Sequence, residues 1–332
     1  MRDFHIQWHI ANRCNLRCIH CYQDDFSSNK ELNLDDLIKI SDNLIDTMKK
    51  WDAYLYLSLT GGEPLLFPYL WDLIDYLNKE KRIYQLSIIT NGTLIDINID
   101  KILKSKIKKI FVSLDGTNAK INDYIRGKGV FDKVIRNIKL LKEKKIKVFI
   151  MYTLMNYNLK EAEELISFCK SIDVDGFIIE RFFPLGFGRK ISEQLVSKED
   201  LLSLYKELFK QTGNIFRLDD VIKTRALYLN LENSQIGLYT SECVVGKFGL
   251  AILSDGGVLP CRRFTLKIGN LLEQTLDEIW KNSEVLNKIR KKENLKGLCK
   301  SCDVKNCIGC RAFVYTLTKD YLAEDKNCFL LS

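Results

Sequence analysis

The chain has 332 residues, of which 28% are charged and 46% hydrophobic, and its formal net charge is +8. This length allows one large domain and a smaller one, and the composition is ordinary for a globular protein. The lysines are spread over many predicted helix faces without an aromatic-rich basic stripe, so nucleic-acid binding is not expected. No apolar run reaches membrane-spanning length and a signal-peptide pattern is lacking, which predicts a cytoplasmic protein without membrane association.

The first feature with chemical consequences is a loop of three cysteines that follows an apolar strand predicted over residues 4–10. Cys14, Cys18 and Cys21 stand in a C-x3-C-x2-C spacing, and the chain has eleven cysteines altogether. The cytosol keeps thiols reduced, so such a set indicates metal binding rather than disulfides. Three thiols suit a four-iron cluster whose fourth iron is open to a small molecule. The alternative is a zinc knuckle that lacks its fourth ligand.

Beyond this loop, strands and helices are predicted to alternate. The strand-like runs cover residues 4–10, 53–59, 84–89, 109–114, 146–154 and 176–182. Apolar residues at helical spacing predict the intervening helices 34–50, 69–78, 96–104, 131–144 and 159–171. This alternation favours an α/β fold with a parallel sheet and right-handed crossovers. Six units are too few for the usual closed eight-stranded barrel.

The alternation stops near residue 191, and a different organisation follows. Apolar spacing predicts two helices, 198–210 and 218–231, which would form a helical linker over residues 196–234. A hairpin is predicted over 249–261, with a glycine-containing turn, and a helix over 276–290. We therefore expect three parts: a barrel-like domain over 1–195, the linker, and a small cysteine-rich domain over 235–332 with a hairpin and helices.

Candidate ligand-binding residues fall at the ends of the predicted strands, where parallel α/β folds bind ligands. These residues are Gly61, Gly62, Glu63, Asn91 and Ser113. Glu63 can accept a hydrogen bond from an ammonium group, or it can cap a tight turn. Asn91 is either a turn residue or a ligand contact. Arg126 can pair with a ligand carboxylate, or with Asp123 on the surface, and His9 in the first strand is expected to be a packing residue.

The cysteine loop with an aromatic residue after Cys21, followed one βα unit later by Gly61-Gly62-Glu63-Pro64, resembles the radical SAM superfamily. The resemblance implies a partial (β/α)6 TIM-like barrel. It also implies that Cys14, Cys18 and Cys21 hold a [4Fe–4S] cluster whose open iron chelates S-adenosylmethionine. The residues implied around this cofactor are Gly61, Gly62, Glu63, Asn91, Ser113 and Arg126. An electron from a donor such as ferredoxin or flavodoxin would then produce a 5′-deoxyadenosyl radical that abstracts hydrogen from the substrate.

The seven downstream cysteines resemble the SPASM domain, which binds two auxiliary iron–sulfur clusters. The spacing from Cys243 to Cys261 matches that family, whereas the later gaps of four and two residues are each one shorter than the family's. Family topology implies an inner cluster held by Cys243, Cys261 and Cys310. It implies a distal cluster held by Cys299, Cys302, Cys307 and Cys328. Seven ligands leave one position of the inner cluster open, or completed by an acid such as Glu242.

Both resemblances together imply an enzyme that carries out a net two-electron oxidation. Sulfatase-activating relatives have an acidic residue after the cysteine equivalent to Cys261, but here Arg262 follows, which disfavours that activity. Arg262 is a candidate substrate contact that would meet a carboxylate, or it pairs with a surface acid. The leading hypothesis is a maturase that crosslinks a ribosomally made peptide, bound directly or with a separate leader-recognition protein. The alternatives are oxidation of a small molecule such as a tetrapyrrole propionate, and an iron–sulfur electron-transfer protein.

Overall fold

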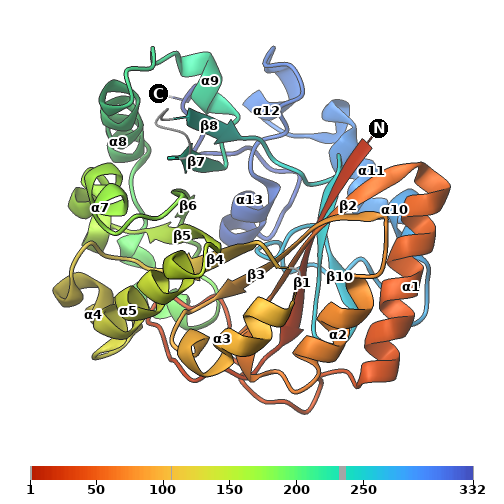
Figure 1. Ribbon diagram of the computed structural model, residues 1–332. Helices are drawn as coiled ribbons and strands as arrows, with labels where there is room; N and C mark the ends of the chain where they lie inside the picture. Colours follow the sequence, from red (N-terminus) through yellow and green to blue (C-terminus); the bar gives the residue numbers. More distant parts are fainter. Residues whose placement is uncertain (1, 106, 232–236, 332) are drawn as a thin grey trace.

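The central element of the fold is a row of six parallel strands (Figure 1). The computed structural model describes residues 2–105, 107–231 and 237–331. Consecutive strands pair with parallel register, and the first and sixth are not neighbours, so the row is an open partial barrel as predicted. The strands are β1 (Arg2–Ala11), β2 (Ala53–Gly61), β3 (Ile83–Thr90), β4 (Lys109–Ser113), β5 (Lys147–Leu154) and β6 (Gly176–Arg181).

Helices connect these strands and cover the outer side of the row in Figure 1. They are α1 (Leu34–Trp51), α2 (Leu70–Leu77), α3 (Ile95–Lys104), α4 (Ala119–Arg126), α5 (Val130–Glu143), α6 (Leu159–Ala162) and α7 (Leu165–Ser171), with short 3-10 turns at Pro64–Leu66, Asn156–Asn158 and Gly186–Gln194. The first of them shows why they form. The side chain of Asn33 caps the N-terminus of α1 by accepting from the amide of Asp36 at 3.0 Å. Leu37, Leu44 and Met48 recur on one face of α1 and are buried in the core.

The cysteine-rich part of the chain extends the same sheet at its β1 edge. β9 (Gly249–Ile252) pairs in parallel with β1, and β10 (Gly257–Leu259) and β11 (Gly269–Asn270) continue the sheet outward. The predicted hairpin is confirmed, with Gly256 in the left-handed region at a φ of 78°. Further helices follow: α10 (Leu276–Asn282), α11 (Glu284–Arg290), α12 (Leu298–Ser301) and α13 (Arg311–Thr318), with a 3-10 turn at Lys292–Asn294. The predicted helix 276–290 is thus two helices, because Ser283 leaves helical geometry and caps the second.

The predicted linker helix 218–231 is wrong beyond its first turn, whereas the preceding helix is present as α8 (Lys198–Gln211). The chain forms α9 (Leu218–Ile222) and then β7 (Ala226–Asn230), which pairs antiparallel with β6 and with β8 (Gly237–Ser241). Leu227 and Leu229 are buried, while Ala226, Tyr228 and Asn230 are partly exposed. This two-residue period is that of a strand, and five residues are too few to separate it reliably from a helical period.

Among the helices of the described residues, none combines the length and the apolar character needed to cross a membrane.

Candidate active site and cluster sites

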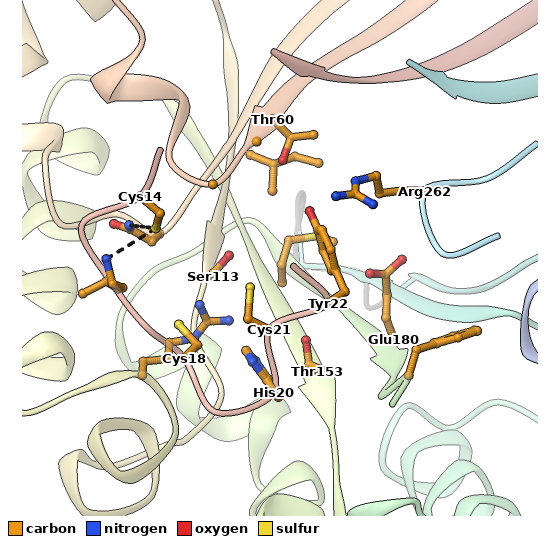
Figure 2. Close-up of a pocket in the computed structure, with 18 of the residues that line it drawn as sticks. Cys14, Cys18, His20, Cys21, Tyr22, Thr60, Ser113, Thr153, Glu180 and Arg262 are labelled. Carbon is orange, nitrogen blue, oxygen red and sulfur yellow. Dashed lines mark hydrogen bonds between the residues drawn. The ribbon is translucent and has the colours of Figure 1, made fainter. Parts of the chain in front are cut away.

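A cavity opens at the carboxyl ends of the parallel strands, and the cysteine loop lines one wall of it. Figure 2 shows Cys14 and Cys18 on one side of this cavity and Tyr22 and Arg262 on the other, with Cys21 between them. Of the predicted site residues, the structure brings together the three loop cysteines with Gly61, Gly62, Asn91, Ser113, Arg126 and Arg262. Residues from six strand ends and from the cysteine-rich part therefore meet at one site.

The cysteine loop is held to the strand ends by backbone and side-chain hydrogen bonds. Glu31 fixes its start, because Oε1 accepts from the amides of Asn12 and Arg13 at 2.9 and 3.0 Å. The amide of Ile19 donates to the carbonyl of Ile125 at 3.0 Å, which ties the middle of the loop to α4. The amide of Cys21 donates to the carbonyl of Cys18 at 3.1 Å, which closes the last turn. The thiols are thus presented by a fixed backbone.

The donor set in this loop fits a polynuclear cluster. Burial raises the pKa of Cys14 and of Cys21, and it raises the pKa of Cys18 to about 12, so the protein alone does not stabilise these thiolates. A bound metal supplies the missing positive charge. Among the described residues, no three His, Cys, Asp or Glu side chains converge on one point as the ligands of a single ion do. Three cysteine thiolates on one short loop, each binding a different iron, are the ligand set of a four-iron cluster with one open iron.

Asp115 is a site residue that the sequence did not reveal. It is fully buried, and its Oδ2 accepts from Arg126 Nη2 at 2.7 Å and lies 2.6 Å from His20 Nε2. Its Oδ1 accepts from the amide of Thr153 at 2.7 Å. Burial opposes ionisation, but Arg126 and His20 outweigh it and lower the pKa of Asp115. The only available signal was its place two residues after Ser113, at the end of β4.

Arg126 is buried beside Cys18 and is not the surface residue that one alternative assumed. Its proposed surface partner Asp123 instead accepts from the amides of Gly129 and Phe131, at 2.6 and 2.8 Å, and so caps α5. The Nε of Arg126 is buried without a hydrogen-bond partner among the described residues. That orphaned donor lines the cavity beside the cysteine loop, where a ligand can satisfy it.

Glu63 follows the end of β2 by two residues and turns its carboxylate away from the cavity. The carboxylate accepts from Thr90 Oγ1 and from the amide of Asn91, both at 2.7 Å, and from the amide of Leu65 at 3.0 Å. Burial raises the pKa of Glu63 to about 7, against these three hydrogen bonds. In this structure Glu63 joins the end of β2 to the end of β3, and the neighbouring glycines rather than its carboxylate line the cavity.

Asn91 is a turn residue that also lines the cavity. Its Oδ1 accepts from the amide of Thr93 at 2.9 Å, which forms a turn after β3. Its Nδ2 donates to Asn15 at 2.9 Å and lies 3.8 Å from Cys14 Sγ. Ser113 at the end of β4 also lines the cavity. Both residues therefore lie where a molecule bound against the cysteine loop would contact them.

The opposite wall of the cavity is cationic and aromatic. The guanidinium of Arg262 lies 4.3 Å from the centre of the Tyr22 ring, and its Nε donates to His9 Nδ1 at 3.2 Å. Burial lowers the pKa of His9 well below 6.5, so the neutral ring can accept this hydrogen bond. Arg263 forms an ion pair with Glu180, but Arg262 pairs with no acid among the described residues. The buried His9 is thus more than a packing residue, since it orients Arg262.

The seven downstream cysteines fall into two groups. In the inner cysteine set (Cys243, Cys261 and Cys310), Cys310 is buried and the other two are half-buried. Burial raises the pKa of Cys243 to about 12, and the neighbouring thiols of Cys310 and Cys261 add to this effect. The distal cysteine set (Cys299, Cys302, Cys307 and Cys328) lines a second, smaller cavity, which Cys310 does not line. That the two sets hold two separate clusters, as the resemblance implies, stays a prediction. Glu242 forms ion pairs with Lys223 and Lys247 at 3.0 and 3.6 Å, so it is already engaged outside the inner set.

Comparisons with known proteins agree with both halves of this arrangement. The sequence model of the radical SAM superfamily matches residues 8–169, and that of the SPASM iron–sulfur cluster-binding domain matches residues 243–303. An AdoMet-dependent heme synthase of Methanosarcina barkeri is 30% identical over 97% of this chain and 95% of its own length. The subtilosin biosynthesis protein AlbA of Bacillus subtilis is 26% identical over 86% of this chain but only 61% of its own length. Streptococcus suis SuiB, solved with its precursor peptide SuiA, has the same fold, with a TM-score of 0.76, 21% identity, and coverage of 99% of this chain and 76% of that one.

Proposed function

The chain belongs to the radical SAM superfamily and carries a SPASM domain, and from this premise we propose that it oxidatively decarboxylates propionate side chains of a tetrapyrrole. As a member of this family it is an enzyme whose cofactors are a [4Fe–4S] cluster with S-adenosylmethionine and auxiliary iron–sulfur clusters. When bound, the first cluster and S-adenosylmethionine supply a 5′-deoxyadenosyl radical that takes a hydrogen atom from the substrate. We assign Cys14, Cys18 and Cys21 to that cluster, and the inner and distal cysteine sets to the auxiliary clusters.

The observation that carries this proposal is the excess of positive charge in the cavity. The lining contains four arginines (Arg126, Arg181, Arg262 and Arg263) and one acid, Glu180. Asp115 neutralises Arg126, and Glu180 neutralises Arg263. Arg181 and Arg262 form no ion pair with an acid among the described residues. Two free guanidinium groups fit a substrate that carries several carboxylates, because planar guanidinium groups bind carboxylates through paired hydrogen bonds.

The proposed reaction removes one hydrogen atom, one carbon dioxide and one electron from each propionate, which becomes a vinyl group. In this scheme Arg262 holds a substrate carboxylate, and His9 and Tyr22 hold Arg262 in place. The rings of Tyr22, Phe26, Phe182 and Phe183 line the same cavity and fit the flat faces of a macrocycle. That a donor such as ferredoxin or flavodoxin supplies the electron to the first cluster stays a prediction.

The relatives also support the choice between substrates. The heme synthase is aligned over nearly its whole length, whereas the alignment with the bacteriocin biosynthesis protein leaves more than a third of that protein unmatched. We therefore place the tetrapyrrole before the peptide, which reverses the order of the two hypotheses drawn from the sequence. Peptide modification is the second candidate, and the similarity to AlbA supports it.

The test is an anaerobic assay of the reconstituted enzyme with S-adenosylmethionine, a reductant and a tetrapyrrole that carries propionates. We expect mass spectrometry to show the loss of one carbon dioxide and two hydrogen atoms for each propionate converted. Formation of 5′-deoxyadenosine with an unchanged tetrapyrrole, but with a modified peptide encoded beside the gene, would establish the second candidate instead.

Two variants sharpen the assay. We expect Arg262→Gln to lower kcat/KM by about tenfold to a hundredfold, since a hydrogen bond to a charged group contributes about 1.5–3 kcal/mol. The control is Arg189→Gln, which removes an arginine whose side chain is 63% exposed and paired with Asp24 outside the cavity lining. Equal rates in the two variants would contradict a substrate contact at Arg262.

A further inference from the structure

Two arginines that the sequence did not single out contact the distal cysteine set. Nη2 of Arg311 donates to Cys299 Sγ at 3.5 Å, and Nη2 of Arg225 donates to Cys307 Sγ at 3.8 Å. Hydrogen bonds of this kind and fixed charges nearby are the main means by which a protein sets the potential of an iron–sulfur cluster. The two contacts involve different cysteines, so the set receives positive charge from two directions.

Arg311 is held rigidly. Its side chain is fully buried, and its Nη1 donates to the carbonyls of Tyr321 and Ala323 at 3.1 and 2.7 Å. These carbonyls lie in the segment between α13 and Cys328, so the arginine also fixes the backbone that leads to the last cysteine. The Nε of Arg311 is buried and has no partner among the described residues. A buried guanidinium with an unused donor beside a thiol is arranged for a negatively charged group.

Arg225 reaches both cysteine sets because of the strand that follows it. In the antiparallel pair of β7 and β8, Ala226 lies opposite Ser241, which brings Arg225 close to Cys243 of the inner set. Its Nη1 donates to the carbonyls of Ile222 and Thr224 at 3.1 and 3.0 Å, so backbone groups hold the cation in place. Its Nε, like that of Arg311, is buried without a partner among the described residues. Arg225 therefore lies between the inner and distal sets, and Cys307, the thiol to which it donates a hydrogen bond, belongs to the distal set.

Asp325 lines the same cavity as the distal cysteine set, and its carboxylate accepts two hydrogen bonds from backbone amides. Oδ2 of Asp325 accepts from the amide of Cys310 at 2.7 Å, and Oδ1 accepts from the amide of Asn327 at 3.2 Å. Within the described residues, neither Arg225 nor Arg311 forms an ion pair with a carboxylate. At the inner set the situation differs, because Arg263 near Cys261 is neutralised by Glu180. The distal set thus has two guanidinium groups hydrogen-bonded to its thiols, in a cavity that Glu324 and Asp325 also line.

We propose that Arg225 and Arg311 are positioning residues that raise the reduction potential of the distal auxiliary cluster and so make it the better electron acceptor of the two. Reduction adds one negative charge to a cluster in a medium of low dielectric, and a fixed cation stabilises that added charge. The proposal rests on the proposed function in one respect, namely that the substrate gives up an electron that needs an acceptor. The potentials themselves do not depend on any substrate.

The experiment is an EPR-monitored redox titration of the anaerobically reconstituted full chain with Cys14, Cys18 and Cys21 replaced by alanine, which leaves only the auxiliary clusters. In this background we compare Arg225→Gln, which removes the charge, with Arg225→Lys, which retains it. The matched control is Lys223→Gln, which removes a positive charge two residues away that is paired with Glu242. Iron content is measured for every variant.

We expect Arg225→Gln to shift the potential of the more easily reduced cluster to a more negative value. Arg225→Lys should stay closer to the parent protein, and Lys223→Gln should not differ from it. Unchanged potentials in Arg225→Gln with full iron content would overturn the proposal, as would equal shifts in the glutamine and lysine variants. If Arg225→Gln loses iron, the outcome for Arg225→Lys decides between the two roles of Arg225. Iron content and potentials equal to those of the parent protein in Arg225→Lys would support a role of the positive charge. Loss of iron in Arg225→Lys as well would show that Arg225 has a purely structural role.

These outcomes are separable from those of the proposed function. A failure of the titration leaves the decarboxylation assay unaffected, because that assay depends on the cavity arginines. A failure of the decarboxylation assay leaves the potentials and their dependence on Arg225 unchanged.

Discussion

The chemical role of each arginine at the cavity depends on what neutralises it. Arg126 is paired with the buried Asp115 and Arg263 with the partly exposed Glu180, so their charges are used within the protein. Arg262 instead stacks on Tyr22, and its Nε donates a hydrogen bond to the neutral ring of His9, which fixes the direction of the guanidinium. A guanidinium that is fixed in direction but not neutralised in charge is suited to bind a carboxylate with little loss of conformational entropy. This difference between the arginines is the reason why Arg262 is the residue that we propose as the substrate contact.

The pair of Asp115 and Arg126 yields a prediction for stability. Asp115→Asn leaves a buried guanidinium without its counter-charge, and removal of one partner of a buried ion pair costs about 3–5 kcal/mol. We expect the free energy of unfolding, measured by denaturant titration, to fall by about that amount. The matched change Asp46→Asn removes an acid whose side chain is 73% exposed, and it should cost at most about 0.5 kcal/mol. Similar losses of stability in both variants would show that the buried pair of Asp115 and Arg126 contributes no more to stability than an exposed acid does.

At the scale of elements, the site depends on how closely the ends of β1 and β2 approach. The amide of Gly62 donates to the carbonyl of Ala11 at 2.7 Å, and that of Glu63 donates to the carbonyl of Arg13 at 2.8 Å. A Cβ atom at Gly62 would lie 2.4 Å from the carbonyl oxygens of Asn12 and Arg13. The segment that leads into the cysteine loop therefore tolerates only glycine on the neighbouring strand end.

Gly62→Ala should accordingly displace the cysteine loop. We expect a loss of about 1–3 kcal/mol in stability from this overpacking, together with a lower iron content at the first cluster after reconstitution. The control is Gly257→Ala in the hairpin, where the added Cβ would meet mainly the flexible end of Lys267, which can move aside. Iron content in Gly62→Ala equal to that in the control would refute this account of the strand ends.

At the scale of the whole molecule, one sheet connects the cavity with both auxiliary sites. β9 joins the cysteine-rich part to β1, and β7 and β8 lie at the other edge beside β6. Of the distal cysteines, Cys299 lies in the short helix α12, and Cys302, Cys307 and Cys328 lie outside strands and helices. A segment with so little regular structure depends on its metal ligands for stability, because metal binding and folding are coupled.

Removal of the clusters should therefore affect one part of the molecule first. We expect chelation of iron to make the region after residue 296 sensitive to limited proteolysis while the parallel strands stay protected, with cleavage sites identified by mass spectrometry. Cys302→Ala should reproduce this sensitivity. Cys169→Ala should not, because Cys169 is buried in the hydrophobic core on α7. Equal protection of the distal segment with and without iron would contradict the coupling.

The cysteine spacing, the six alternating units and the strand-end motifs were readable from the sequence, because each is a local pattern. Periodicity reports which face of a segment is apolar, and spacing within a short loop limits how far apart its thiols can lie. The same reasoning failed at 226–230, where five residues did not separate a strand from a helix. Arg225 and Arg311 gave no signal and Asp115 gave only its place after Ser113, since charged residues are common in this chain.

The tertiary structure decided which charges are neutralised and which stay available. The partners of Arg262 and Arg263 lie 253 and 83 positions away along the chain, at His9 and Glu180. No local pattern encodes such distant pairs, because burial and counter-charge arise only when the sheet has brought its two edges together. The sequence by itself therefore determined the kind of chemistry, through the cysteine loop. The folded arrangement of arginines and acids decided the kind of substrate that we propose for it.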